Sequence, residues 1–266
     1  MRLALIAMLT LACLPATAQE SPLVSLQTSD DSKGWNAVGR LNLGERGFCT
    51  GTLIAPDMVL TAAHCLFDKE TGARVEARDI HFLAGLRNGR AEAYRNVARA
   101  VAHPDYAYSG ADDLERTAFD VAVLELDQPI RLPSIQPIAV TAPPALGDQV
   151  GVVSDAQDRA EAPSLPQICH VIDGSDKVLV LSCDVDFGSS GAPIFTVKNG
   201  MPQIVSVVSA KAESGGKKVS LGTRLEAPLA VVMAELAKEN RTVSVAGSKV
   251  NILSGGKASG AKFIKP

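Results

Sequence analysis

The sequence predicts an all-β protein made of two six-strand halves followed by one C-terminal helix. Short apolar runs rich in Val, Leu and Ile recur about ten to twenty residues apart and are broken by Gly, Pro, Asn and Asp. A proline-rich stretch at 132–148 divides these runs into two sets. Near the end, 227–241 spaces its apolar residues as an amphipathic helix does. Many short strands at such spacing favour an antiparallel sandwich or barrel.

The chain begins with a predicted secretory signal peptide, residues 1–18. Arg2 precedes an apolar run too short to span a bilayer, and the small residues at 16–18 form a cleavage site. Cleavage after Ala18 predicts a secreted or periplasmic protein. Lipid anchoring at Cys13 is the alternative, but the residues before that cysteine fit lipoprotein processing poorly.

Residues 19–34 form a short N-terminal segment, and the first half of the protein spans 35–131. Its strands are predicted at 35–44, 48–55, 57–65, 80–86, 95–104 and 120–130. The crossover at 132–148 is too rich in proline for a central strand or a helix interior.

The second half spans 149–226, and no internal repeat relates it to the first. Its strand runs are 148–156, 167–174, 177–183, 192–200, 202–210 and 218–226. The helix at 227–241 follows, and 242–266 has four lysines, no acidic residue and a Gly/Ser-rich middle. Such a composition buries little apolar surface, so we expect a flexible basic tail.

Charge and hydropathy exclude two classes of partner. The formal net charge of −3 and a pI near 5.8 give no basic face for nucleic acid. No apolar segment after the signal peptide is long enough to span a membrane. We expect a soluble exported monomer.

Four cysteines remain once Cys13 leaves with the signal peptide, an even number that indicates two disulfides in an exported chain. Of the three possible pairings we predict the nearest-neighbour one, Cys49–Cys65 and Cys169–Cys183. Each bond would close a loop of about fifteen residues and stabilise the fold by about 3 kcal/mol. The tight Cys and His spacing of a zinc site is absent from the sequence, so we predict no metal.

The stretch "CDVDFGSSGAPIF", residues 183–195, raises the question of chemistry. A Gly-Ser-Ser-Gly segment is usually a flexible turn. A serine becomes a nucleophile only beside a base that a third group orients. Of the four histidines, His64 follows a strand-like run and precedes a cysteine, whereas His103 lies in a pre-proline turn typical of an exposed loop. His81 and His170 alternate with apolar neighbours, as at a sheet surface.

Three segments together resemble the chymotrypsin-like (trypsin-fold) serine proteases of the bacterial exported type. They are "VLTAAHC" at 59–65, "FDVAVLEL" at 119–126 and "GSSGAP" at 188–193, in the order His, Asp, Ser. The likeness extends over most of 35–235, and it implies two six-stranded antiparallel Greek-key β-barrels. It also implies a serine endopeptidase that acts on polypeptides with neither metal nor organic cofactor.

The resemblance assigns a role to each matching residue. His64 matches the general base, Asp120 the acid that orients it, and Ser190 the nucleophile. The backbone N–H groups of Gly188 and Ser190 match the oxyanion hole. The alternative for Asp120 is a solvated carboxylate at a strand end, although an acid just before an apolar strand is costly to bury without a partner.

This chain departs from the family pattern around the nucleophile. Ser189 stands where digestive members carry the aspartate that pairs with a new N-terminus, so we expect no activation by cleavage of a zymogen. Ala192 replaces a glycine. Ser209 and Ala210 are predicted to replace the Trp-Gly pair that lines the substrate channel.

Substrate preference is predicted by counting back from the nucleophile. Asp184 falls six residues before Ser190, where trypsin-like enzymes place their pocket aspartate, and this predicts cleavage after basic residues. Asp186 competes for that position, and a turn aspartate facing water is the alternative. Small or apolar residues rank second and acidic ones last. A catalytically silent trypsin-fold binding protein is the alternative function.

Overall fold

The computed structural model describes residues 24–25, 34–44, 47–108, 114–154, 164–165, 168–185 and 188–247. The predicted signal peptide, Asp186 and residues 248–266 of the predicted tail lie outside the described residues.

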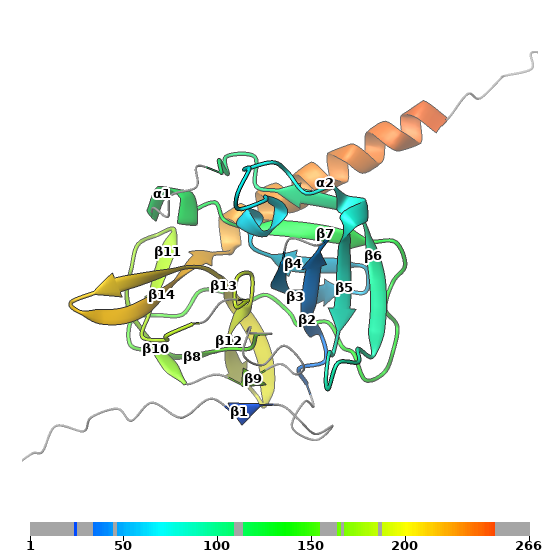
Figure 1. Ribbon diagram of the computed structural model, residues 1–266. Helices are drawn as coiled ribbons and strands as arrows, with labels where there is room; N and C mark the ends of the chain where they lie inside the picture. The colour runs from blue at the N-terminus through cyan, green and yellow to red at the C-terminus, as the bar shows by residue number, and fades with distance from the viewer. Residues whose placement is uncertain are drawn as a thin grey trace, which may run out of the picture.

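The first half of the chain forms a closed six-stranded antiparallel barrel with the order β2-β3-β4-β7-β6-β5 (Figure 1). Its strands are β2 (Val38–Leu43), β3 (Phe48–Ala55), β4 (Met58–Thr61), β5 (Ile80–Ala84), β6 (Ala93–Ala102) and β7 (Ala122–Leu126). Strands β2 to β4 are consecutive neighbours, and β5 returns to pair with β2, which is a Greek key. The predicted six-stranded barrel is therefore confirmed.

The barrel closes where two strand backbones approach without a side chain between them. A Cβ added to Gly39 of β2 would lie 2.2 Å from the carbonyl oxygen of Leu83 on β5. Glycine is thus required at this point of closure. Inward-facing side chains, among them Leu41, Leu53 and Phe82, are fully buried and fill the barrel.

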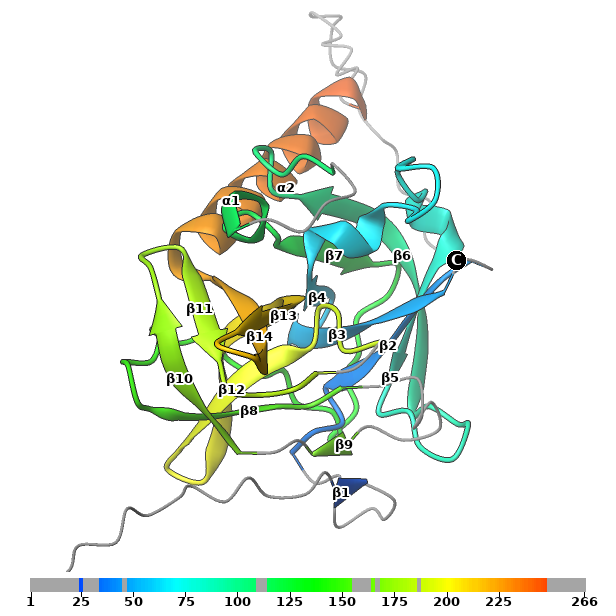
Figure 2. The same cartoon turned by 60° about the vertical axis from the view of Figure 1, so that its left-hand side comes forward.

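The second barrel repeats the same topology with a different sequence. Its order is β10-β11-β14-β13-β12-β8, and β12 returns to pair with β8 in a second Greek key. Its strands are β8 (Gln149–Val152), β10 (Cys169–Gly174), β11 (Val178–Leu181), β12 (Pro193–Lys198), β13 (Met201–Ser214) and β14 (Lys217–Arg224). Figure 1 and Figure 2 show β13 and β14 as a long hairpin of this second barrel.

The two barrels share apolar packing, so they form one continuous body. Trp35 lies just before β2, and the centroid of its ring is 4.3 Å from the centroid of the Phe195 ring on β12. Ile204 and Val207 of β13 belong to the same buried cluster as the core of the first barrel. The segment from 127 to 148 connects the barrels without a helix or strand, as its prolines predict, and Ile138 hydrogen-bonds to Leu53.

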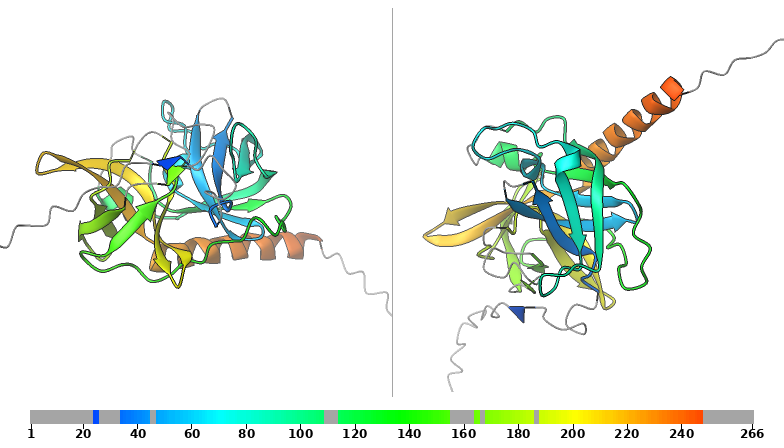
Figure 3. Two further views of the ribbon diagram at one scale, coloured as in Figure 1. Left: turned by 90° about the horizontal axis from the view of Figure 1, so that it is seen from below. Right: turned by 45° about the vertical axis from the view of Figure 1, so that its right-hand side comes forward.

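The C-terminal helix α2 (Glu226–Gly247) starts at the second barrel and runs along the first (Figure 3). Val232 and Leu236 of α2 are buried in the first barrel's core cluster. The predicted end at Arg241 is wrong, because the helix continues six residues into the predicted tail. Extending a formed helix costs far less free energy than nucleating one, so weak local helix propensity beyond Arg241 does not end it.

Five short elements appear that the sequence analysis does not predict. They are β1 (Val24–Ser25) paired with β9 (Ser164–Leu165), the 3-10 turns η1 (Ala63–Leu66) and η2 (Ala77–Asp79), and helix α1 (Leu114–Thr117). Within the described ranges, every helix is too short or too polar to cross a membrane.

Candidate active site

His64 lies on η1, directly after β4, and two bonds fix this turn. The disulfide Cys49–Cys65 ties the neighbouring residue to β3. The backbone N–H of His64 donates to Asp120 Oδ1 at 2.8 Å. The side chain of His64 is 13% exposed, so its ring is held at the edge of the protein interior with access to solvent.

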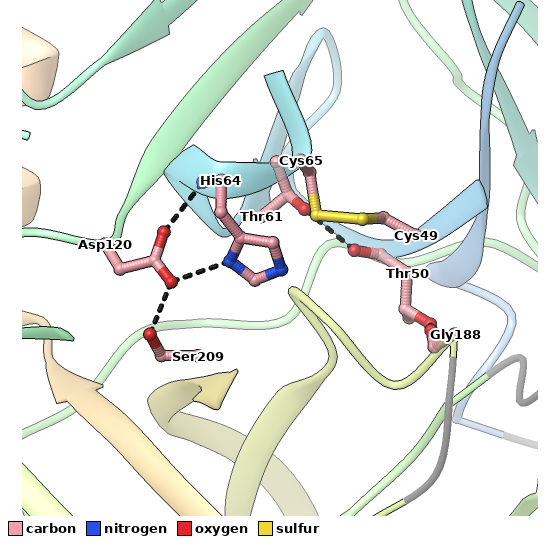
Figure 4. The surroundings of a disulfide bond; sticks show 8 residues. All are labelled: Cys49, Thr50, Thr61, His64, Cys65, Asp120, Gly188 and Ser209. Carbon is pink, nitrogen blue, oxygen red and sulfur yellow. Dashed lines mark hydrogen bonds and ion pairs between the residues drawn. A yellow bond between two sulfur atoms is a disulfide. The ribbon is translucent and has the colours of Figure 1, made fainter. Parts of the chain in front are cut away.

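Asp120 lies between α1 and β7, and its side chain is only 3% exposed. Oδ2 lies 2.7 Å from His64 Nδ1 and accepts a second hydrogen bond from the Ser209 hydroxyl on β13 (Figure 4). Together with the backbone N–H of His64, the carboxylate has three donors. A buried carboxylate is tolerated when its oxygens are hydrogen-bonded in this way.

The His64–Asp120 bond selects one protonation form of the imidazole. An ionised carboxylate only accepts hydrogen bonds, so His64 Nδ1 must carry the proton that bonds Asp120 Oδ2. In the neutral ring Nε2 is then an acceptor, and it lies on the side of the ring away from Asp120 (Figure 4). This is the arrangement that a general base requires.

Ser190 lies in a turn of residues 188–192 that precedes β12. This turn is called the nucleophile loop, after the role predicted for Ser190. The Thr50 N–H on β3 donates to the Ser190 carbonyl at 2.9 Å. A Cβ added to Gly191 would lie 2.1 Å from Thr61 Oγ1 and 2.9 Å from the Ala62 nitrogen, so the loop packs closely against the chain just before His64. This packing brings Ser190 to the part of the molecule that contains His64, although the two residues are 126 positions apart in the sequence.

The other residues of the nucleophile loop are also bonded. Gly188 has φ of +92°, and its carbonyl accepts a hydrogen bond from Thr50 Oγ1 at 2.8 Å (Figure 4). Ser189 is 3% exposed, and its hydroxyl donates to Ser154 Oγ at 3.0 Å. The sequence does not single out Thr50 and Ser154, because nothing distinguishes one hydroxyl residue in a strand run from another.

Comparison with known proteins decides the family. A trypsin family model matches residues 27–230, which is most of the chain. The chain belongs to the trypsin family. Over 92 residues, 35% of this chain and 33% of that protein, it is 38% identical to human chymotrypsin-like elastase family member 1. The alignment therefore spans about a third of that relative's length.

A solved structure described as a Glu endopeptidase in complex with MPD has the same fold. The TM-score is 0.66 at 19% sequence identity, and the match covers 81% of this chain and 96% of that one. With the two closed barrels described above, this confirms the predicted trypsin fold. The match to the family model confirms the predicted membership of the chymotrypsin-like serine proteases.

The structure gives contacts for two residues predicted to bind substrate in this trypsin-family chain. The Ser209 hydroxyl bonds Asp120. The side chain of Asp184 is 47% exposed, and its Oδ2 lies 3.1 Å from Lys218 Nζ on β14, so it is not a buried unpaired acid at a pocket base.

Both disulfides of this trypsin-family protein have the nearest-neighbour pairing, Cys49–Cys65 and Cys169–Cys183. Cys49, Cys65 and His64 place their ligand atoms within 4.8 Å of one another, the spacing of a metal site. The two sulfurs are bonded to each other, however, and a metal ligand must be a thiolate. The cluster is therefore part of the fold around His64.

His103 is not the exposed loop residue that its sequence position suggests. It is 4% exposed, its ring lies 5.0 Å from that of Phe119, and its Nδ1 accepts the Asp105 N–H at 3.2 Å. Burial lowers the pKa of His103, while the nearby Asp105 carboxylate raises it in part. A neutral, packed histidine results, whereas His81 is exposed and bonds Asn96 as expected at a sheet surface.

Proposed function

We propose that this trypsin-family protein is an exported serine endopeptidase that hydrolyses peptide bonds through Ser190, His64 and Asp120. The observation that carries the proposal is the buried Asp120 carboxylate bonded to His64 Nδ1 at 2.7 Å. Attachment of the nucleophile loop to β3, beside that pair, supports Ser190 as the third member. The proposed substrate is a polypeptide, and the chain would act as a monomer with neither metal nor organic cofactor.

The proposed reaction has two halves. Ser190 Oγ attacks the scissile carbonyl carbon while His64 Nε2 takes its proton, and Asp120 stabilises the imidazolium. Backbone N–H groups of Gly188 and Ser190 stabilise the oxyanion, each worth about 3 kcal/mol in this class of reaction. His64 then protonates the leaving amine. Water next attacks the acyl-enzyme while His64 Nε2 takes its proton, and His64 returns that proton to Ser190 Oγ as the acid product leaves.

Digestion of a peptide library, read by mass spectrometry, tests this function. We expect cleavage products with the wild type and none above background with Ser190→Ala. A fluorophosphonate should label the wild type at Ser190. A folded protein that neither cleaves nor labels would support the alternative, a catalytically silent trypsin-fold binding protein.

Export is proposed together with the function, since disulfides persist in oxidising compartments, either the periplasm or the exterior. We predict that loss of Cys49–Cys65 lowers activity more than loss of Cys169–Cys183. Both bonds close loops of similar length, 16 and 14 residues of sequence separation, so each should stabilise the fold by about 3 kcal/mol. Only the first adjoins His64.

The measurement for the disulfides compares Cys49→Ala/Cys65→Ala with Cys169→Ala/Cys183→Ala. Turnover per folded molecule and thermal unfolding are recorded for both. Equal turnover in the two variants, or free thiols at Cys49 and Cys65 in non-reducing peptide mapping, would contradict the prediction.

Preference for basic residues before the scissile bond stays a prediction. Lys218 would compete with a basic side chain of the substrate for Asp184. An arginine of the substrate would have to displace Lys218 from Asp184. Because the pair is exposed, we expect Lys218→Ala to raise the preference for arginine only about twofold to fivefold. Asp184→Ser should abolish it.

Peptides that differ only in the residue before the cleaved bond provide the measurement of specificity. The wild type and both variants are assayed for kcat/KM on arginine, alanine and glutamate substrates. If the wild type does not prefer arginine, or if the preference survives Asp184→Ser, Asp184 does not determine specificity. Preference for small or apolar residues would then be the next prediction.

A further inference from the structure

Two buried hydroxyls outside the triad bond the nucleophile loop, one from each barrel. Thr50 of β3 is fully buried and bonds the Gly188 carbonyl through Oγ1 at 2.8 Å. Ser154, two residues after β8, is 7% exposed and accepts the Ser189 hydroxyl at 3.0 Å. The first contact comes from the first barrel and the second from the second barrel.

These contacts act on the peptide planes around the nucleophile. The carbonyl of Gly188 shares a plane with the N–H of Ser189, so the Thr50 bond fixes the direction of that plane. The next plane contains the Ser189 carbonyl, which accepts the Ala192 N–H at 2.9 Å, and the N–H of Ser190. Since Ser189 joins both planes, its buried side chain sets their relative orientation.

The Ser189–Ser154 contact is also neutral. A buried carboxylate at position 189 would need a cationic partner, whereas two hydroxyls share a neutral hydrogen bond and keep the same charge at every pH. Among the described residues, the side chain of Ser189 is therefore held by a neutral contact within the second barrel.

We propose that Thr50 and Ser154 are positioning residues that hold the nucleophile loop in its reactive conformation without a charged N-terminus. The proposal rests on the proposed function, because it assigns the N–H groups of Gly188 and Ser190 to the oxyanion hole. Removing either hydroxyl leaves the reacting groups in place but lets the peptide planes rotate.

Thr50→Val and Thr50→Ser form the first matched pair of variants. Valine keeps the shape of threonine and loses the hydroxyl, while serine keeps the hydroxyl. We expect Thr50→Val to lower the rate of Ser190 labelling by a fluorophosphonate about tenfold, and Thr50→Ser to stay within about threefold of wild type. On a peptide substrate kcat should fall with KM changed less than about twofold.

The second arm is a double-mutant cycle. Ser154→Ala, Ser189→Ala and the double variant should each slow labelling by the same factor, about tenfold, because each removes the same bond. Circular dichroism and thermal unfolding confirm that every variant is folded. If the losses in labelling rate add in the double variant, or if KM rises while kcat is unchanged, the hydroxyls do not position the loop.

The third arm alters the amino terminus of the full chain. A protein that starts at Gln19 is compared with one that carries four extra residues before Gln19. Equal labelling rates are expected, and loss of labelling in the extended chain would overturn the proposal. If the wild type is labelled and Thr50→Val and Ser154→Ala are labelled at the wild-type rate, the positioning proposal is wrong and the proposed function stands. If the wild type is not labelled, both the positioning proposal and the proposed function are wrong.

Discussion

Replacing Ser190 or His64 by alanine is expected to lower peptidase turnover about 10⁴-fold to 10⁶-fold. Ser190→Ala removes the atom that attacks, and His64→Ala removes the base that the Asp120 bond holds in the reactive form. Because the two side chains act as a unit, the double variant should be no slower than either single variant. Both variants should remain folded, because the side chains of His64 and Ser190 are only partly buried and neither belongs to the apolar core.

Ser189→Ala is the matched control, since it alters the neighbouring serine of the same loop. Its loss should be about tenfold, the effect of one neutral buried hydrogen bond. Turnover is measured on one peptide substrate, with active-site titration to count competent molecules and thermal unfolding to follow the fold. Comparable losses at Ser189 and Ser190 would show that the nucleophile is wrongly assigned.

The fold was predictable because each strand carries its own signal. All twelve barrel strands lie within or overlap the predicted apolar runs, and the prolines after Arg131 divide them correctly. The pairing of Val24–Ser25 with Ser164–Leu165 was not predicted, since it joins two short segments far apart in sequence. Local composition does not predict the end of α2, because a helix that is already formed continues past Arg241 at little cost in free energy.

The sequence predicts residues of the candidate site where the order of motifs along the chain places them. It does not predict contacts that depend on an irregularity in a strand. Ser209 lies at a shift of register between Val208 and Ala210 on β13, and such a bulge redirects a side chain. Counting residues along the strand therefore does not predict the bond between the Ser209 hydroxyl and Asp120. Counting back to Asp184 likewise takes no account of Lys218 on a neighbouring strand.

Asp120→Asn is expected to lower turnover about 10⁴-fold at neutral pH, although it changes the shape of the side chain very little. The reason lies in the backbone of His64. Its N–H points at Oδ1 from 2.8 Å, so the amide of asparagine must place its oxygen there and its NH₂ group toward His64 Nδ1. Nδ1 then becomes the acceptor, and the proton of the neutral ring moves to Nε2. Such a ring cannot take a proton from Ser190.

Ser209→Ala separates this tautomer effect from simple loss of a hydrogen bond to Asp120. It removes one of the three donors to the carboxylate but leaves the bond to His64 Nδ1. Its loss should be about tenfold to hundredfold, as for one hydrogen bond to a charged group. The imidazole nitrogen shifts of His64, measured by NMR, should report a proton on Nδ1 in wild type and Ser209→Ala, and on Nε2 in Asp120→Asn. A proton that stays on Nδ1 in Asp120→Asn, or a variant within tenfold of wild-type turnover, would mean that Asp120 does not set the protonation form of His64.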